Sequence, residues 1–383
     1  MKKVQVALKD SSYSIVVGYG ILDKFPGAVK KLGIGTDAVI ITNPLIRKIY
    51  GSRLAKGLLK AGFTVKVLEV ADSERSKSID VAVGLIKEIT RYAADKRPFI
   101  VALGGGVVGD LAGFVAAVYK RGVPFVQVPT TLLAQIDSAI GGKVAVDLPE
   151  GKNLVGAFYQ PKLVWADVAL LSSLSDRQLR NGLAEAVKYG VIADAELFDR
   201  LEADVRLLLS RDRAALSRVV LACAAIKARV VEVDEKEAKG IRTVLNFGHT
   251  AGHAIEAACG YGRYHHGEAV ALGMRVACRM SVAAQLLPAR DALRVEMLLS
   301  EIGLPQEARG ATLGKVLGAM KFDKKFESGK IRFVLARGIG RAVIAGGVPE
   351  GFVAGILKGI FPDLPRDPCG ADFSNEKSGL IRA

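Results

Sequence analysis

The chain has 383 residues, of which 50% are hydrophobic and 24% are charged. This balance is that of a globular protein, so a wholly disordered chain is excluded, and the length favours two to three domains. Lysine and arginine number 54 against 39 acidic residues, a net charge of +15, which suggests an anionic partner: nucleic acid, an acidic membrane, or a phosphorylated or carboxylated small molecule.

The N-terminus is basic, but Lys9 and Asp10 interrupt the apolar stretch before the core of a signal peptide can form. No run approaches the roughly 18 apolar residues of a membrane-spanning helix. The cysteines, Cys223, Cys259, Cys278 and Cys369, lie far apart, which indicates reduced thiols rather than a disulfide framework. We therefore expect a soluble, cytoplasmic protein.

Short runs rich in β-branched residues recur through residues 1–170, with amphipathic, helix-length segments such as Leu45–Ala61 and Ile79–Ala93 between several of them. Strands that alternate with helices predict a mainly parallel α/β sheet. The expected strands are Val4–Leu8, Ser14–Gly18, Ala38–Thr42, Thr64–Val70, Phe99–Leu103, Phe125–Val128 and Leu163–Ala166.

Beyond residue 170 the apolar residues recur mostly at helical spacing. The expected helices are Arg177–Tyr189, Ala195–Leu209, Ala214–Val233, His249–Ala258, Glu268–Leu286 and Arg290–Ile302, with one late hairpin over Ile331–Ala336 and Ala342–Ala345. The pattern predicts an α/β domain over residues 1–172, a mostly helical domain over 173–362 and a flexible tail over 363–383.

A glycine-rich stretch follows the expected strand Phe99–Leu103 and opens a helical segment. Gly104, Gly106 and Gly109 fit a GxGxxG turn, in which backbone N–H groups at a helix N-terminus bind a pyrophosphate. The acidic residue usual about 20 residues later is missing, so this is no ordinary dinucleotide fingerprint, and Glu74 upstream is a candidate for the ribose contact. A tight turn without a ligand is the alternative.

All histidines of the chain, His249, His253, His265 and His266, fall within one short stretch, which favours metal binding over satisfied structural imidazoles. His249 and His253 lie at i and i+4 on one helix face, as in the HExxH motif of zinc hydrolases. Thr250 stands where that motif has its glutamate, so the general base of that class is absent. The residues alone leave open whether His265 or His266 is a ligand and which carboxylate completes the site.

Several cations adjoin small polar residues, a setting in which surface lysines are common. Lys143 and Arg121 are the stronger candidates for ligand contacts because both lie at βα-type loops. Lys152, Lys188, Lys227, Arg242 and Lys324 extend the set.

In these segments the chain resembles the 3-dehydroquinate synthases, a family of sugar phosphate cyclases. The matching segments, in order, are GGGVVGDLAGF, YKRGVPFVQVPTTLLAQIDSAIGGK, GKNLVGAFYQP, GLAEAVKYG, DEKEAKGIRTVLNFGHTAGHAIEA, HHGEAVALGM and DKK. The resemblance implies a Rossmann-like NAD-binding α/β domain followed by a mostly α-helical domain that binds metal and substrate. It also implies a zinc ion, or cobalt in its place, held by Glu185, His249 and His266.

The resemblance further implies which residues contact NAD and which contact the substrate. The residues implied for NAD are Asn43, Glu74, Lys77, Gly105, Gly106, Val107, Asp110, Thr130, Thr131, Lys143, Lys152 and Ser173. The residues implied around the substrate phosphate are Lys143, Asn153, Arg121, Asn246, His253 and Lys324. Lys227 and Arg242 would hold the substrate carboxylate, His253 would take part in proton transfer, and Asp137 and Lys188 are further site positions.

By resemblance, then, the chain is a phosphate-eliminating carbon–oxygen lyase that converts 3-deoxy-D-arabino-heptulosonate 7-phosphate to 3-dehydroquinate with catalytic NAD and a divalent metal. The alternatives are another cyclase, such as the one that makes the amino analogue of dehydroquinate, and a metal-dependent polyol dehydrogenase. A homodimer is implied, in which Arg121 reaches the neighbouring site. Nucleic acid is not an expected partner because no aromatic-interleaved basic stripe is present.

Overall fold

The computed structural model describes residues 1–93, 95–260, 262–321, 326–327 and 330–362, so the expected tail over 363–383 lies outside the described residues. The chain divides into two compact units. The first comprises residues 1–179 and 211–238, and the second comprises residues 180–210 and the chain from 239 onward. This division differs from the single boundary expected near residue 172, because the long helix α9 (Arg213–Val233) packs with the first unit.

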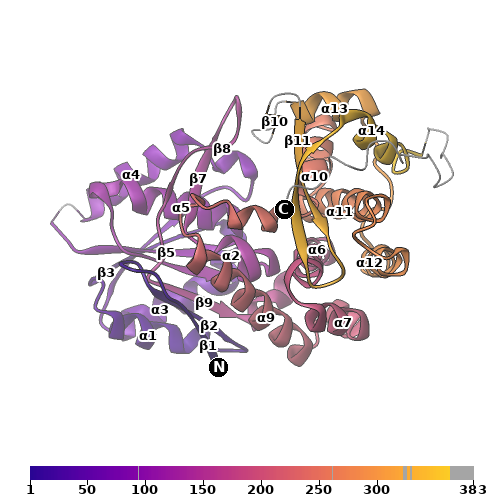
Figure 1. The fold of residues 1–383 in the computed structure, drawn as a ribbon. Coiled ribbons are helices and arrows are strands. Elements are labelled where there is room, and N and C mark those ends of the chain that lie inside the picture. Colours follow the sequence, from indigo (N-terminus) through magenta and orange to yellow (C-terminus); the bar gives the residue numbers. More distant parts are fainter. Residues whose placement is uncertain (94, 261, 322–325, 328–329, 363–383) are drawn as a thin grey trace. The chain divides into compact units, whose positions relative to one another are not determined.

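The first unit is built on a seven-stranded sheet in the order β1-β2-β9-β6-β5-β3-β4 (Figure 1). Every neighbouring pair is parallel except β1 and β2, so the expected mainly parallel sheet is confirmed. The strands are β1 (Lys2–Val6), β2 (Tyr13–Gly18), β3 (Asp37–Thr42), β4 (Thr64–Glu69), β5 (Pro98–Gly104), β6 (Phe125–Pro129) and β9 (Leu163–Asp167).

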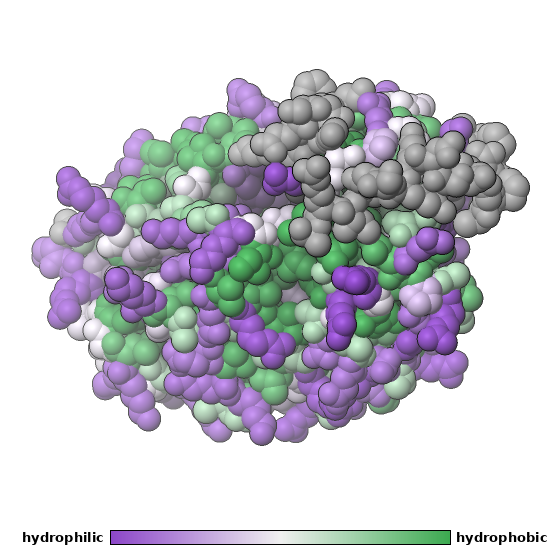
Figure 2. Space-filling model, in the orientation of Figure 1, coloured by the Kyte–Doolittle hydropathy of each residue, from purple (hydrophilic) through white to green (hydrophobic). Residues whose placement is uncertain are grey.

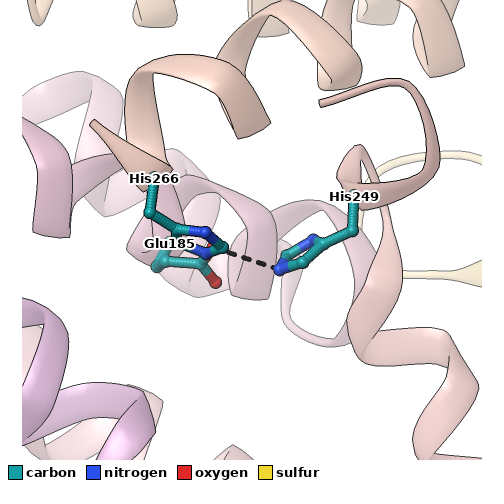
Figure 3. Close-up of side chains that lie close together, drawn as sticks. All are labelled: Glu185, His249 and His266. Carbon is teal, nitrogen blue, oxygen red and sulfur yellow. Dashed lines mark hydrogen bonds and ion pairs between the residues drawn. The ribbon is translucent and has the colours of Figure 1, made fainter. Parts of the chain in front are cut away.

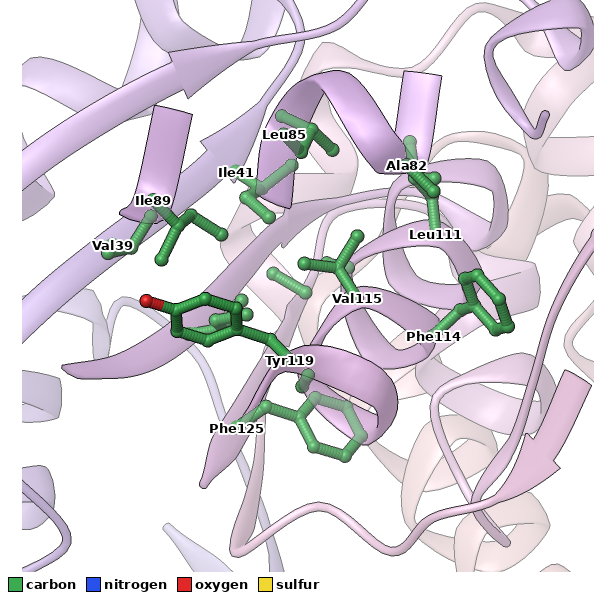
Figure 4. Packing of buried hydrophobic residues seen from close by; sticks show 14 of the residues in the cluster. Val39, Ile41, Ala82, Leu85, Ile89, Leu111, Phe114, Val115, Tyr119 and Phe125 are labelled. Carbon is green, nitrogen blue, oxygen red and sulfur yellow. The ribbon is translucent and has the colours of Figure 1, made fainter. Parts of the chain in front are cut away.

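Helices cover both faces of this sheet because its central strands are apolar on both sides. In β3, Val39 and Ile41 pack in one cluster with α4 (Ile79–Ala93) and α5 (Gly106–Val118), as Figure 4 shows. The alternate residues Ala38 and Ile40 pack in a second cluster with α1 (Phe25–Leu32) and α3 (Ser52–Lys60). A strand buried on both faces is the expected product of βαβ connections.

Shorter elements complete the first unit. The expected helix over Leu45–Ala61 is α2 (Pro44–Ile46), a π-turn η2 (Arg47–Gly51) and α3 in succession. A two-stranded hairpin, β7 (Lys143–Leu148) and β8 (Gly151–Phe158), was not expected from the sequence. The remaining short helices are η1 (Leu22–Lys24), η3 (Glu74–Ser76), η4 (Tyr119–Arg121), η5 (Ala134–Ser138) and η6 (Val168–Ser173).

The second unit is mostly helical, as expected, with a small three-stranded sheet. Its core joins α10, α11, α13 and α14 to strands β11 and β12. Its elements are α6 (Asp176–Ala193, which begins in the first unit), α7 (Ala195–Ala203), α8 (Val205–Leu209), η7 (Ile241–Asn246), α10 (His249–Ala258), α11 (His266–Ala283), α12 (Ala289–Glu301), α13 (Leu313–Lys321), β10 (Phe326–Glu327), β11 (Lys330–Ala336), β12 (Ala342–Val348) and α14 (Glu350–Lys358).

The surface is chemically mixed. Figure 2 shows hydrophilic side chains spread over the visible face, with hydrophobic residues between them. Among the described residues, no helix is both long enough and apolar enough to cross a bilayer.

Glycines let α10 and α11 cross with their backbones nearly in contact. A Cβ on Gly273 of α11 would lie 1.8 Å from the carbonyl oxygen of Gly248, the residue that precedes α10. Gly248 itself has φ of 78°, a left-handed conformation that favours glycine. A Cβ on Gly252 of α10 would lie 2.8 Å from the Ala269 oxygen. These contacts fix where α10 begins relative to α11.

We expect Gly273→Ala to lower the free energy of unfolding by about 3 kcal/mol, because the added methyl group forces the two backbones apart. Urea denaturation measures the change. Gly318→Ala in α13 is the matched control, since a Cβ there meets nothing within 4 Å and should stabilise the helix by up to about 1 kcal/mol. Equal effects of the two substitutions would contradict the role of the crossing.

Candidate metal and cofactor site

Three side chains from three helices of the second unit point toward one another (Figure 3). Glu185 lies in the middle of α6, His249 is the first residue of α10 and His266 is the first residue of α11. The Glu185 Oε1 atom lies 3.2 Å from His266 Nε2 and 3.6 Å from His249 Nε2. One ligand atom from each residue lies within 4.8 Å of the other two. Glu185 and His249 are buried.

The charges around this cluster favour the forms that bind a cation. Burial raises the pKa of the Glu185 carboxyl, but the ammonium of Lys188 and the neighbouring imidazoles outweigh burial and hold that pKa well below its usual range. Burial lowers the pKa of His249 well below its usual range. The cluster therefore presents an anionic carboxylate and a neutral imidazole, which are the forms that ligate metals.

The third ligand residue, His266, titrates differently. Burial lowers its pKa, but the hydrogen bond and negative charge of Glu185 have the larger combined effect and raise it. The same carboxylate therefore raises the pKa of both imidazoles, although burial prevails at His249.

The donor set fits a divalent transition metal. Two imidazoles and one carboxylate are the ligands of several catalytic zinc sites, and three protein ligands leave positions open for water or substrate. Imidazole ligands also suit neighbouring metals such as cobalt. The residues present therefore fit the metal that the sequence implied.

Of the other candidates in the second unit, His253 and Lys188 lie on the same helices as this cluster. The ring of His253 lies 5.2 Å from that of His249 and 5.9 Å from that of His266, measured between centroids. Lys188 is buried and forms an ion pair with Glu185 one turn away on α6. Arg242 is buried in η7, which ends at Asn246 just before α10. Lys324 lies outside the described residues.

Asn181 joins α6 directly to the start of α11. Its Oδ1 accepts a hydrogen bond from the Gly267 N–H, and a Cβ on Gly267 would lie 2.1 Å from the Asn181 carbonyl oxygen. Asn181 lies one turn before Glu185, and Gly267 follows His266. The contact therefore sets the position of His266 relative to Glu185.

We expect Asn181→Ala to weaken Zn²⁺ binding by about 10- to 100-fold, as the loss of a group that orients a metal ligand typically does. Titration with Zn²⁺ against a competing chelator measures the affinity. Asn181→Asp keeps an acceptor for the Gly267 N–H and should bind Zn²⁺ far more tightly than the alanine variant. Wild-type affinity in Asn181→Ala would show that the contact is dispensable.

In the first unit a buried lysine gathers residues from distant segments. The Lys77 Nζ atom donates to Asp110 Oδ2 at 2.8 Å and to the side-chain oxygen of Asn153, and lies 4.0 Å from Asp147 Oδ1. Burial raises the pKa of the Asp110 carboxyl, and Lys77 opposes that rise without cancelling it. Asn153 has φ of 56°, and its N–H donates to Asp147 at 2.7 Å. Lys77 and Asp110, which the resemblance implies for NAD, thus lie beside Asn153, which it implies for the substrate phosphate.

The glycine turn after β5 has the form that the sequence predicted. Gly105 precedes α5, and Gly106 and Val107 form its first turn. A Cβ on Gly105 would lie 2.9 Å from Thr131 Cγ2, so the backbone of this turn approaches the segment after β6 closely. Asn43 follows β3, accepts the Ile46 N–H at 2.8 Å and donates to Asp72 at 2.9 Å.

Two further ion pairs involve candidate cations of the first unit. Lys227 of α9 pairs with Asp137 of η5, and both side chains are largely buried. Lys143, the first residue of β7, pairs with Glu237, and both side chains are partly exposed. Glu237 has φ of 58°.

The remaining candidates of the first unit lie on separate elements. Glu74 is exposed in η3, and Arg121 is exposed at the end of η4 with φ of 64°. Thr130 is buried directly after β6, whereas Lys152 of β8 and Ser173 of η6 are half-buried.

Comparisons with known proteins match both halves of the chain to one family. The family model described as 3-dehydroquinate synthase N-terminal matches residues 67–181, and the one described as 3-dehydroquinate synthase C-terminal matches residues 182–326. A 3-dehydroquinate synthase from Desulforamulus reducens is 46% identical over 358 residues, which is 93% of this chain and 99% of that protein. This chain belongs to the 3-dehydroquinate synthase family. The resemblance drawn from the sequence is therefore confirmed.

Solved structures of related cyclases share the fold. A 2-deoxy-scyllo-inosose synthase, complexed with carbaglucose-6-phosphate, NAD⁺ and Co²⁺, has a TM-score of 0.85 at 27% identity, covering 93% of this chain and 99% of its own. A 2-epi-5-epi-valiolone synthase from Streptomyces hygroscopicus subsp. jinggangensis, with NAD⁺ and Zn²⁺ bound, has a TM-score of 0.83 at 28% identity, covering 92% of this chain and 97% of its own. The expected fold class is confirmed.

Three residues that contact the candidates are not among those that the sequence patterns indicated. Asp147 supports Asn153, Glu237 pairs with Lys143, and Asn181 holds the residue after His266. Glu237 lies in the matched segment DEKEAKGIR, so its position in a motif was a usable signal. The contact of Asp147 depends on the β7–β8 hairpin, which the sequence did not predict. The contact of Asn181 depends on long-range packing, for which the sequence carries no local signal.

Proposed function

We propose that this chain is a 3-dehydroquinate synthase, which converts 3-deoxy-D-arabino-heptulosonate 7-phosphate to 3-dehydroquinate and phosphate. The observation that carries the proposal is the cluster of Glu185, His249 and His266, in a chain whose family membership extends over nearly its whole length. The related cyclases of known structure, at 27% and 28% identity, are more distant than the 3-dehydroquinate synthase at 46%.

Glu185, His249 and His266 would hold the divalent metal, Zn²⁺ or Co²⁺. Together, the bound metal and NAD supply Lewis-acid activation of a substrate hydroxyl and a reversible hydride acceptor. Glu185 is anionic and His249 is neutral, which are the forms in which these ligands bind a metal. Lys188 balances the carboxylate charge within the buried helix. His253, beside both ligand histidines, would move a proton at the substrate.

The βα turns of the first unit would bind NAD. Gly105, Gly106 and Val107 would bring backbone N–H groups to the pyrophosphate at the N-terminus of α5. Asn43, Glu74, Lys77, Asp110, Thr130, Thr131, Lys143, Lys152 and Ser173 would complete the NAD contacts. Lys77 would orient both Asp110 and Asn153, to which it already donates.

Two sets of polar side chains would bind the two acidic groups of the substrate. Lys143, Asn153, Arg121, Asn246, His253 and Lys324 would surround the phosphate. Lys227 and Arg242 would hold the carboxylate, and Asp137 would fix Lys227 through their ion pair. Cations that are already paired within the protein lose little conformational freedom when the anion binds. A carboxylate subsite favours this substrate over that of a cyclase acting on a sugar phosphate that has no carboxylate.

The proposal includes a homodimer in the cytoplasm. Arg121 is exposed at the end of η4, in a left-handed backbone conformation. An exposed arginine there is available to the phosphate site of a second copy.

The decisive assay supplies purified, metal-loaded protein with 3-deoxy-D-arabino-heptulosonate 7-phosphate and NAD far below the substrate concentration. We expect stoichiometric release of phosphate with no net NADH, since the hydride returns before product leaves. Conversion of the supplied NAD to NADH without release of phosphate would reject the lyase and favour a polyol dehydrogenase. No turnover of this substrate, but turnover of its amino analogue, would assign the alternative cyclase.

A further inference from the structure

The turn that carries Lys143 is held on several sides. Gly141 and Gly142, just before β7, have φ of 97° and 68°, which favours glycine at both positions. The Gly141 N–H donates to Tyr13 Oη at 3.0 Å, and the Tyr159 N–H donates to the Gly142 oxygen at 2.7 Å. The turn is thus anchored to β2 and to the end of β8.

Gln160 supplies a further contact to this turn from a buried position. Its Nε2 donates to the Gly141 oxygen at 3.3 Å. A Cβ on Gly142 would lie 2.7 Å from the Gln160 Cδ atom, so the side chain packs directly on the turn. Any larger residue at position 142 would displace it.

The same amide also reaches the segment that holds the partner of Lys143. Gln160 Nε2 donates to Glu235 Oε1 at 3.3 Å, and Glu235 accepts a second hydrogen bond from Ser11 Oγ at 2.8 Å. Two residues further on, Glu237 forms the ion pair with Lys143. One side chain therefore fixes both segments that meet in the Lys143–Glu237 pair.

The chemistry of an amide suits this position. Both partners of Nε2 are acceptors, so a group with two N–H bonds is required, which neither a carboxylate nor a thioether provides. Among the described residues, Gln160 Oε1 is buried without a hydrogen-bond partner. Such an atom is unfavourable for folding, so what the amide contributes at this position is the pair of hydrogen bonds that its Nε2 donates.

We propose that Gln160 is a positioning residue that sets the geometry of Lys143 for the substrate phosphate. The proposal rests on the proposed function, in which Lys143 contacts that group. Gln160 itself touches neither substrate nor cofactor. It acts by holding the Gly141–Gly142 turn and residues 235–237 in register.

The test combines two substitutions. We expect Gln160→Met to lower kcat/KM for the heptulosonate phosphate by about tenfold, the low end for a group that orients a functional residue. If Gln160 acts through Lys143, the double variant Gln160→Met/Lys143→Ala will have the kcat/KM of Lys143→Ala alone. A further tenfold loss in the double variant would indicate independent action and overturn the proposal.

A second readout does not depend on activity. Hydrogen exchange at the Gly141 and Tyr159 amides should be faster in Gln160→Met, because the turn loses one of its anchors. Leu58→Ala is the control: Leu58 is buried in α3 against the opposite face of the sheet, so it should lower stability without changing kcat/KM or exchange at the turn. If the wild-type protein releases no phosphate, the proposed function fails. Unchanged exchange in Gln160→Met overturns the positioning role whether or not the enzyme is active.

Discussion

His249→Ala is expected to lose its divalent metal and to release phosphate about 1,000-fold more slowly than the wild type. A bound metal of this kind lowers the free energy of the transition state by several kcal/mol, and each 1.36 kcal/mol corresponds to about tenfold in rate. With His249 removed, only Glu185 and His266 remain of the three converging ligands, and two ligands do not hold a catalytic metal tightly. Metal content after dialysis, measured by mass spectrometry, and phosphate release report the two effects separately.

The neighbouring histidines provide the matched control. His265 precedes α11 and is not part of the three-residue cluster, whereas His266 is. His265→Ala should keep its metal, and His266→Ala should lose it. The reverse result would show that the ligand has been assigned to the wrong histidine. Retention of metal and full turnover in His249→Ala would contradict the site as a whole.

The histidines show how far the sequence alone defines the site. Their clustering and the i, i+4 spacing of His249 and His253 indicate a metal without any knowledge of the fold. Helix geometry makes that pair the natural choice of ligands, yet the structure groups His249 with Glu185 and His266 instead. The reason is tertiary: α6 and the start of α11 come together through Asn181 and Gly267. Among the sequence features, only the resemblance to a family implied that grouping.

The fold was predictable where local patterns dominate. The parallel strands are short, mainly apolar runs that are mostly buried, and their expected bounds agree with the structure to within about two residues, as is usual for such boundaries. The hairpin β7–β8 was missed because β8 is largely exposed and its sequence, GKNLVGAF, contains two glycines and no alternating pattern. The expected helix Ala195–Leu209 is broken between α7 and α8 at Asp204, which a helical period does not reveal.

Long-range packing accounts for the other differences. Helix α9 belongs to the first unit because it packs on β1, β2 and η5, although it follows α7 and α8 of the second unit in the chain. No local feature of residues 213–233 distinguishes a helix that returns to the sheet from one that stays in a helical domain. The same holds for the Lys77 cluster and for Gln160, whose partners lie far away in sequence.

Lys143→Ala is expected to reduce phosphate release by about 100- to 1,000-fold, the usual cost of removing one group that stabilises developing negative charge. The Lys143 side chain is 53% exposed, so it is available to an incoming anion while Glu237 holds its position. An exposed ion pair contributes only about 0–1 kcal/mol to stability, so the melting temperature should hardly change and lost activity would report on the site itself.

Two further variants separate the position of Lys143 from its charge. Lys143→Arg keeps a cation but changes its shape and reach, so we expect activity between those of Lys143→Ala and the wild type. Lys162→Ala removes an exposed lysine of the same unit and keeps the backbone N–H that donates to the Phe125 oxygen, so it should leave turnover unchanged. Full activity in Lys143→Ala would remove Lys143 from the phosphate site. Equal losses in Lys143→Ala and Lys162→Ala would mean that the enzyme responds to its overall positive charge and not to a cation fixed at the start of β7.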